Sequence, residues 1–436
     1  MTEILLGASL LGVALLLVVH GLQRWGVWGC IGLLLLFLGT CLPYNARSDR
    51  LLRVSILGIW WSAAELLAVV CLVPLALYWV TFALRRRWWT AGTLRDIFLV
   101  STLSVFVLSG TATNGMIAVL GDVRCWLVLI VEAGAVSLAQ SNRRWRRYEY
   151  LQAVFSVLAA AMCLEILLNV ILQPTLAWPS FRLSSRNDFG LVILLVRVIF
   201  DGRMRWSMRS ILGLLIVTGV ALTLSRSIWF TMTATLVVVV ALRARFRWSH
   251  HAVRTTVYVG GTLLFLTPMV TIVVGQIDSF RASIQILAAR LYSMATFASD
   301  ASYILRAADI VTARRMWIES PLLGRGLGTS ILTATLGGVE GIYIDNTWWT
   351  LLAKMGLVGT TIIVLLAVPL LRLSVLYIRR SGNILDVALG ASIVCLGVLS
   401  LFGSIGHGEG DMMWLGLAWA LMRVHGRNVS QVRDSP

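Results

Sequence analysis

Charge is scarce in this chain: only 13% of its 436 residues are charged, while 58% are hydrophobic. With a mean hydropathy of +0.85, this composition excludes an ordinary soluble globular domain. The six cysteines show no CxxC spacing, so the sequence predicts neither a metal site nor a disulfide framework. Lysine is nearly absent, since Lys354 is the sole lysine among 37 basic residues. This bias reflects either codon usage or selection for bidentate phosphate contacts by arginine.

What the chain has instead is a series of apolar runs that can cross a hydrocarbon core of about 30 Å. They lack the period-2 alternation of barrel strands, so we expect helices. The sequence therefore predicts an all-α polytopic membrane bundle of about 12–14 spans, with residues 1–436 forming a single integral membrane domain and the first run retained rather than cleaved. The expected runs are 4–20, 26–42, 54–84, 96–110, 125–139, 150–172, 188–200, 210–224, 228–242, 255–275, 346–378, 384–403 and 412–423.

Arginine clusters separate many of these runs and account for most of the net charge of +17. If the spans alternate, six clusters fall on one side, which the positive-inside rule makes cytoplasmic. The long segment 276–345 then becomes an external loop, and polar chemistry is expected on that outer face. The six clusters are 85–95, 143–147, 203–209, 243–254, 372–380 and 423–433.

Arg226 interrupts an otherwise apolar stretch between residues 211 and 242. Fifteen helical residues rise only about 22 Å, so this arginine is expected below the outer surface of the bilayer. A charge there costs at least about 2.5 to 3.5 kcal/mol, which indicates a wet cavity, an anion or a buried carboxylate partner. Glu65, Glu132 and Glu165 are the carboxylates that would serve as such a partner.

The external loop contains two segments with helical periodicity, Ile277–Met294 and about Tyr303–Glu319. In the second, Arg306, Ile310, Ala313 and Trp317 share one face. This pattern predicts a helix on the membrane surface, with Trp317 at the interface and Arg306 near headgroup phosphates. A plain interfacial helix without a catalytic role would show the same pattern.

The sequence PLLGRGLG follows, and its alternating glycines resemble a nucleotide-binding loop only superficially. No strand precedes it and no GK[ST] ends it. We interpret it as a helix stop at Pro321 followed by a flexible glycine turn.

Polar residues gather at the expected outer ends of other helices. Asp345 and Asn346 precede the run 346–378, where either is a good N-cap and Asp345 is also a candidate base. Arg124, Arg186, Asn187 and Asn346 itself are further candidates for substrate binding. His407, Glu409 and Asp411 have HxExD spacing on a glycine-rich loop, which is a weak metal signal, and we expect no metal.

The blocks RAADIVTARRMWIESPLLGRGLG and DNTWWTLLAKMGLVG, with LTLSRSIW and SSRNDFG upstream, resemble the O-antigen ligase and polymerase superfamily of bacterial envelope glycosyltransferases. The resemblance covers about residues 110–360. It implies a GT-C-like fold with a large periplasmic loop, in the bacterial inner membrane, and transfer of glycan from an undecaprenyl-pyrophosphate donor to an acceptor sugar hydroxyl, with inversion and without metal or other cofactor. The acceptor is either another lipid-linked glycan, in a polymerase, or lipid A-core, in a ligase.

By the same resemblance, Arg226 and Arg306 correspond to arginines that bind the pyrophosphate, and Asn187 to an asparagine that begins an outer helix. The chain departs from many relatives at Asp345, where ligases especially carry histidine. The shape, elongation, division and sporulation glycosyltransferases are similar in using an external aspartate as base. A flippase or transporter of lipid-linked glycans is the alternative, although no paired interrupted halves are visible.

Overall fold

The computed structural model describes residues 53–56, 59–85, 91–141, 226–247, 301–334, 339–341, 346–381 and 384–400, with isolated positions at 27, 30, 31, 34, 195, 196, 198, 200, 207, 211–213, 216, 344, 415 and 416. Within these residues the chain is mostly helical. The runs predicted at 4–20, 26–42, 150–172, 188–200, 210–224, 255–275 and 412–423 lie wholly or largely outside them.

Six of the predicted apolar runs lie mostly within described helices: 54–84 in α3, 96–110 in α4, 125–139 in α5, 228–242 in α9, 346–378 in α13 and 384–403 in α14. Among the described residues, α13 alone is long and apolar enough to be a candidate membrane span. The bounds are α3 Ala63–Arg85, α4 Ala91–Asn114, α5 Met116–Ser141, α9 Arg226–Arg247, α12 Ala301–Glu319, α13 Thr347–Arg380 and α14 Ile384–Leu399.

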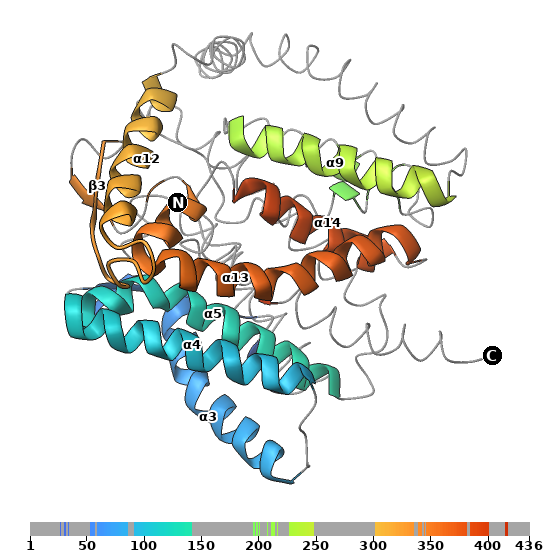
Figure 1. The fold of residues 1–436 in the computed structure, drawn as a ribbon. Coiled ribbons are helices and arrows are strands. Elements are labelled where there is room, and N and C mark those ends of the chain that lie inside the picture. The colour runs from blue at the N-terminus through green and yellow to red at the C-terminus, as the bar shows by residue number, and fades with distance from the viewer. Residues whose placement is uncertain are drawn as a thin grey trace, which may run out of the picture.

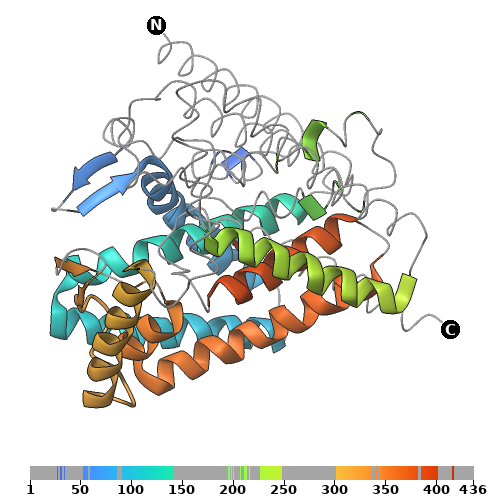
Figure 2. The same ribbon diagram turned by 90° about the horizontal axis from the view of Figure 1, so that it is seen from above.

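The helices pack in a stack in which α13 is central. On one side α13 contacts α4, which packs with α5, and α5 in turn contacts α3; on the other side it contacts α14 and α9. Figure 1 shows α4, α5, α13, α14 and α9 running in broadly similar directions, whereas α12 crosses the end of α13. The view from above shows the same crossing (Figure 2). Because α12 contacts both α13 and β3, it closes one end of the stack.

Two short hairpins depart from the all-α prediction. β1 (Arg53–Ile56) pairs antiparallel with β2 (Ile59–Ser62), and β3 (Ile331–Thr333) pairs antiparallel with β4 (Val339–Gly341). The prediction of a continuous helical run over 54–84 is therefore wrong for its first residues, since α3 begins at Ala63. These residues are apolar like a span, but they are also β-branched and aromatic, and a short apolar run does not distinguish a strand from a helix.

The connection between α4 and α5 is much shorter than expected. The predicted runs 96–110 and 125–139 leave residues 111–124 between them, but α4 continues to Asn114 and α5 begins at Met116. Gly115, with φ 85°, is the residue between them, a backbone conformation that glycine adopts without strain. Residues 116–124 thus belong to a helix rather than to a loop. From this helix Arg124 meets Glu65 of α3, and Asp122 meets Lys354 of α13.

Candidate functional site

Asn346 caps α13 as the sequence predicts. Its Oδ1 accepts a hydrogen bond from Trp349 N at 3.1 Å, and its backbone at φ −156° and ψ 112° is extended. The Thr350 hydroxyl donates to Asn346 O at 2.9 Å and closes the first turn. A cap of this kind stabilises a helix by about 1 kcal/mol. Asp345, the candidate base, lies outside the described residues.

α12 lies where a helix was predicted and ends at the predicted residue, Glu319. The orientation of its apolar stripe differs from the prediction, because the stripe faces protein rather than a membrane surface. Ala313 is fully buried in a cluster with Ile331 and Ala353, and Ile310 packs against that cluster. The arrangement fixes α12 against α13.

Trp317 continues this contact at the end of α12. Its ring meets that of Trp349 edge-on, with centroids 6.2 Å apart, and its Nε1 donates to Pro321 O at 3.1 Å. Trp317 therefore joins α12 to the first turn of α13 and to the segment that follows α12. Its position at a lipid interface stays a prediction. Arg306 lies about three turns earlier on the same helix and is partly buried.

The segment after α12 is a fixed element rather than the flexible turn we expected. α13 is broken at Gly356, where the backbone has φ 61° and ψ −165°. The break leaves peptide groups without helical partners, and residues 321–326 supply partners for them. Four backbone hydrogen bonds join the two segments: Arg325 N to Ala353 O at 2.9 Å, Gly326 N to Lys354 O at 2.9 Å, Leu357 N to Pro321 O at 2.9 Å and Val358 N to Leu322 O at 3.0 Å.

Glycine is required on both sides of this contact. Gly324 and Gly356 both have positive φ. A Cβ on Gly324 would lie 2.6 Å from Gly356 N, and one on Gly356 would lie 2.5 Å from Gly324 N, closer than any Cβ is found to such an atom. The turn PLLGRGLG therefore has its glycines because two backbones meet there, and not because a phosphate needs a cradle.

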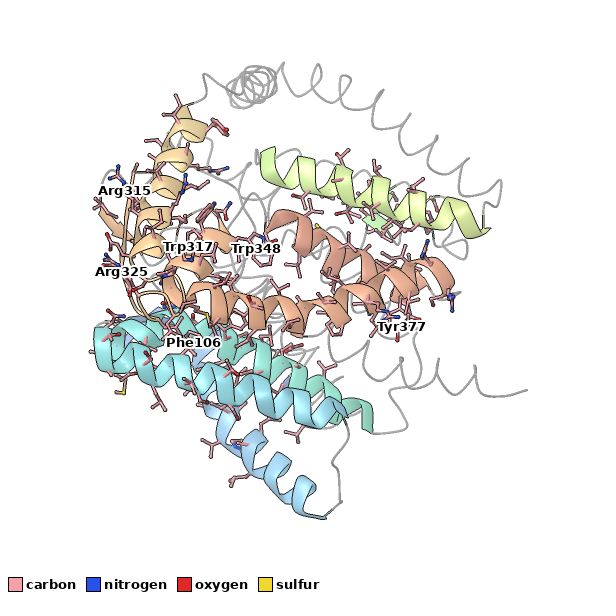
Figure 3. All side chains as sticks on the ribbon, viewed as in Figure 1. Phe106, Arg315, Trp317, Arg325, Trp348 and Tyr377 are labelled. Carbon is pink, nitrogen blue, oxygen red and sulfur yellow. The ribbon has the colours of Figure 1, made fainter. Side chains whose placement is uncertain are left out.

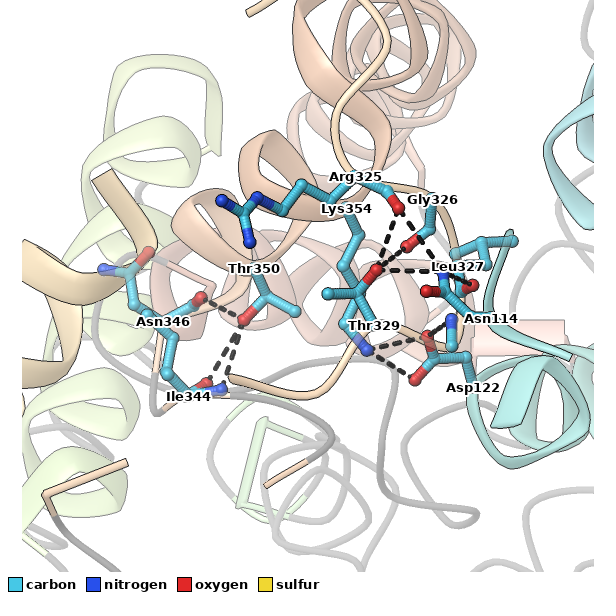
Figure 4. Close-up of polar contacts among 11 residues, drawn as sticks. Asn114, Asp122, Arg325, Gly326, Leu327, Thr329, Ile344, Asn346, Thr350 and Lys354 are labelled. Carbon is cyan, nitrogen blue, oxygen red and sulfur yellow. Dashed lines mark hydrogen bonds and ion pairs between the residues drawn. The ribbon is translucent and has the colours of Figure 1, made fainter. Parts of the chain in front are cut away.

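A buried ion pair lies beneath the turn. Lys354 Nζ is 2.6 and 2.7 Å from the two carboxylate oxygens of Asp122, and both side chains are only 3% exposed. Asp122 Oδ2 also accepts a hydrogen bond from Gly328 N at 2.6 Å. One carboxylate therefore links α5, α13 and the turn (Figure 4). Breaking such a pair leaves a buried charge without compensation.

Asn114 secures the turn from the end of α4. Its Nδ2 lies 3.3 Å from Arg325 O, 2.9 Å from Leu327 O and 2.9 Å from Thr329 Oγ1. Thr329 Oγ1 itself donates to Arg325 O or Gly326 O, each at 2.9 Å. The carbonyl groups of the turn are thus satisfied by side chains from the turn itself and from α4 (Figure 4).

The other predicted site residues are only partly placed. Arg226 is the first residue of α9, which packs against α13 and α14. Arg124 lies within α5, with its Nε 3.1 Å from Glu65 Oε1, so Glu65 is an ion-pair partner of Arg124. Arg186 and Asn187 lie outside the described residues, as do His407, Glu409 and Asp411. No group of three or more potential metal ligands occurs within the described segments.

Sequence reasoning missed Asp122, Lys354 and Gly356. A signal for the lysine was present, because a single lysine inside an apolar run needs a partner or a wet cavity. Its partner lies 232 residues earlier, and sequence spacing cannot identify a pair at that distance. Comparison of the chain with known proteins gave no further guide, since no family model matches it and no curated protein matches it.

Proposed function

We propose that the chain is a polytopic membrane protein. α13 is a candidate span by length and composition, and apolar helical segments also occur at Glu65–Leu77, Trp126–Val136, Thr231–Leu242 and Asp386–Val398. Large aliphatic side chains are exposed on several helices, including Val70 at 71%, Leu108 at 69% and Leu365 at 62%. Such surfaces are costly in water and favourable in lipid.

The ends of the helices support one orientation. α9 finishes with arginines at 243, 245 and 247, and α13 finishes with Arg379 and Arg380. The positive-inside rule places both ends in the cytoplasm. Arg226, at the start of α9, and Asn346, at the start of α13, then lie toward the outer face together with α12.

The proposed activity is transfer of a glycan from an undecaprenyl-pyrophosphate donor to a sugar hydroxyl at this outer face. The observation that carries the proposal is the fixed contact between α12, which bears Arg306, and α13, which begins two residues after Asp345. A rigid attachment of this kind suits a site in which a cation and a base act on one substrate. The resemblance to O-antigen ligases and polymerases supplies the substrate class.

In this mechanism Asp345 accepts the proton of the acceptor hydroxyl as its oxygen attacks the anomeric carbon. The bond from that carbon to the pyrophosphate oxygen breaks, and the configuration inverts. Arg226 and Arg306 neutralise the negative charge that develops on the departing pyrophosphate, a contribution of about 3 kcal/mol per donor in comparable sites. No metal is needed for this step.

A flippase for lipid-linked glycans is the second candidate, and the break in α13 favours it, because transporters bind substrates at interrupted helices. In this chain, however, the peptide groups exposed at Gly356 are hydrogen-bonded to residues 321–326. These peptide groups are therefore already hydrogen-bonded within the chain and are not available to a transported substrate. A structural role for the break explains this better than a transport site does.

The experiment that distinguishes these functions uses the purified chain, a donor with a labelled glycan, and either a second lipid-linked glycan or lipid A-core as acceptor. A polymerase lengthens the lipid-linked glycan, and a ligase moves the label to lipid A-core. A donor that remains intact with both acceptors while it crosses the bilayer of a vesicle would replace the transferase proposal with the flippase.

A further inference from the structure

Arg325 has a backbone held from two sides. Its N–H donates to Ala353 O at 2.9 Å, and its carbonyl lies within hydrogen-bond distance of Asn114 Nδ2 at 3.3 Å and Thr329 Oγ1 at 2.9 Å. Its neighbours Gly324 and Gly326 have no side chains and press against other backbone or side-chain atoms. Arg325 therefore supplies the one side chain that extends from residues 324–326, and it extends from a rigid base.

The Arg325 side chain is 43% exposed, although its backbone lies in a well-packed turn. Its guanidinium forms an ion pair with Glu319 at the end of α12, and Glu319 is itself 56% exposed. Figure 3 places Arg325 at the same end of the molecule as Arg315 and Trp317. In Figure 4 its side chain extends from the turn in the direction of Thr350, in the first turn of α13.

The Arg325 side chain has hydrogen-bonding capacity beyond its ion pair with Glu319. A guanidinium has five N–H donors, and one exposed carboxylate uses at most two of them well, so donors remain for a second anionic group.

We propose that Arg325 binds a phosphate group of the lipid-pyrophosphate donor, and that Glu319 holds its side chain in place when the donor is absent. This inference rests on the proposed function and adds a residue that sequence reasoning had assigned only to a turn. The fixed backbone means that only the side chain loses conformational freedom when the phosphate binds, which favours affinity for the donor.

The test compares Arg325→Gln with Glu319→Gln and with Arg315→Gln, a matched loss of an exposed arginine on α12. Donor KM and kcat are measured for each full-length protein after its thermal stability is checked. We expect Arg325→Gln to raise the donor KM roughly tenfold, the scale of one lost charge-assisted hydrogen bond, with a smaller change in kcat. Glu319→Gln and Arg315→Gln should keep the donor KM within about twofold of wild type.

Two results would overturn the inference. One is a donor KM for Arg325→Gln that equals that of Arg315→Gln. The other is an equal rise in Glu319→Gln and Arg325→Gln, which would show that the ion pair matters only for the fold. Arg325→Lys provides a second variant if the glutamine variant is unstable. It should bind the donor more weakly than wild type, because an ammonium does not make the two parallel hydrogen bonds of a guanidinium to phosphate.

A binding measurement separates this inference from the proposed function. Undecaprenyl pyrophosphate is added to each protein, and the shift in melting temperature is recorded. If wild type transfers no glycan but is stabilised by this lipid through Arg325, the proposed function fails and the phosphate contact stands. If wild type transfers glycan and Arg325→Gln is stabilised as strongly as wild type, the phosphate contact fails and the proposed function stands.

Discussion

Lys354 and Asp122 form the most buried charged contact of the site, and their roles differ. The lysine belongs to the broken helix α13, whereas the carboxylate also holds Gly328 of the turn. Asp122 therefore has two partners and Lys354 has one described partner. Loss of the lysine leaves the carboxylate buried with a single backbone donor, which does not compensate a full charge.

We expect Lys354→Met to lower the free energy of unfolding by about 3–5 kcal/mol, because it leaves Asp122 charged and buried. Adding Asp122→Asn should recover part of this loss, since an amide is neutral and its oxygen still accepts the Gly328 N–H. Unfolding of the purified proteins by denaturant in detergent measures both effects. A double variant that is less stable than Lys354→Met would contradict this explanation.

Asp345 is the candidate base, whereas the neighbouring Asn346 caps α13. Asp345→Asn should leave thermal stability nearly unchanged, because it leaves the cap at Asn346 in place, but it should lower turnover by about 100-fold or more. Asp345→His should recover some activity, because neutral imidazole accepts a proton near pH 7. Donor turnover by the three proteins provides the measurement, and full activity in the asparagine variant would reduce Asp345 to a structural residue.

At the scale of elements, the joint between α13 and the turn depends on Gly356. We expect Gly356→Ala to destabilise the protein by at least about 2 kcal/mol, because φ is positive there and the new Cβ would collide with the turn. Gly397→Ala in α14 is the matched control: its Cβ would lie 3.6 Å from Leu371 Cδ2, an ordinary contact, and alanine favours a helix. Thermal unfolding of the two variants should separate them, and equal melting temperatures would show that the joint contributes little.

Some of these elements were predictable and others were not, for identifiable reasons. α12 and its end at Glu319 follow from helical periodicity and from the proline two residues later. The break at Gly356 does not, because LLAKMGLVG has the composition of a continuous helix and the compensating hydrogen bonds come from a segment about thirty residues earlier. Arg306, Ile310 and Ala313 were correctly grouped on one face, but what that face meets depends on tertiary packing.

The candidate site also has features that could be predicted from the sequence and features that could not. A cap by Asp345 or Asn346 at the start of α13 was predictable, since it needs only the local sequence and the start of a helix, and the structure shows that Asn346 provides it. The contact of Trp317 with Trp349 and the contact of Arg124 with Glu65 were not, because each joins separate helices. Asp345, Arg186 and Asn187 remain predictions of the sequence, as do the side-chain contacts of Arg226.

For the whole molecule, the proposed orientation in a membrane rests on the arginine-rich helix ends. A cysteine introduced at Ser299, in the proposed external loop before α12, should react with an impermeant maleimide added to intact cells. A cysteine at Ser141, at the end of α5, should react only after the membrane is opened. Labelling in the opposite pattern would place α12 and the start of α13 in the cytoplasm, where the proposed transfer does not occur.

The release of undecaprenyl pyrophosphate from the glycan donor tests the proposed chemistry most directly. It reports cleavage of the bond between the anomeric carbon and the pyrophosphate oxygen, the step that Arg226 and Arg306 are proposed to promote. Wild type, Arg226→Lys and Arg226→Ala are assayed at matched concentration with acceptor present and metal chelated. Wild type should release the lipid, and the lysine variant should be nearly as impaired as the alanine variant. The reason is that an ammonium is a point charge and does not form the bidentate hydrogen bonds of a guanidinium to pyrophosphate. No release by wild type, or full release by Arg226→Lys, would contradict the proposed role of Arg226 in glycan transfer.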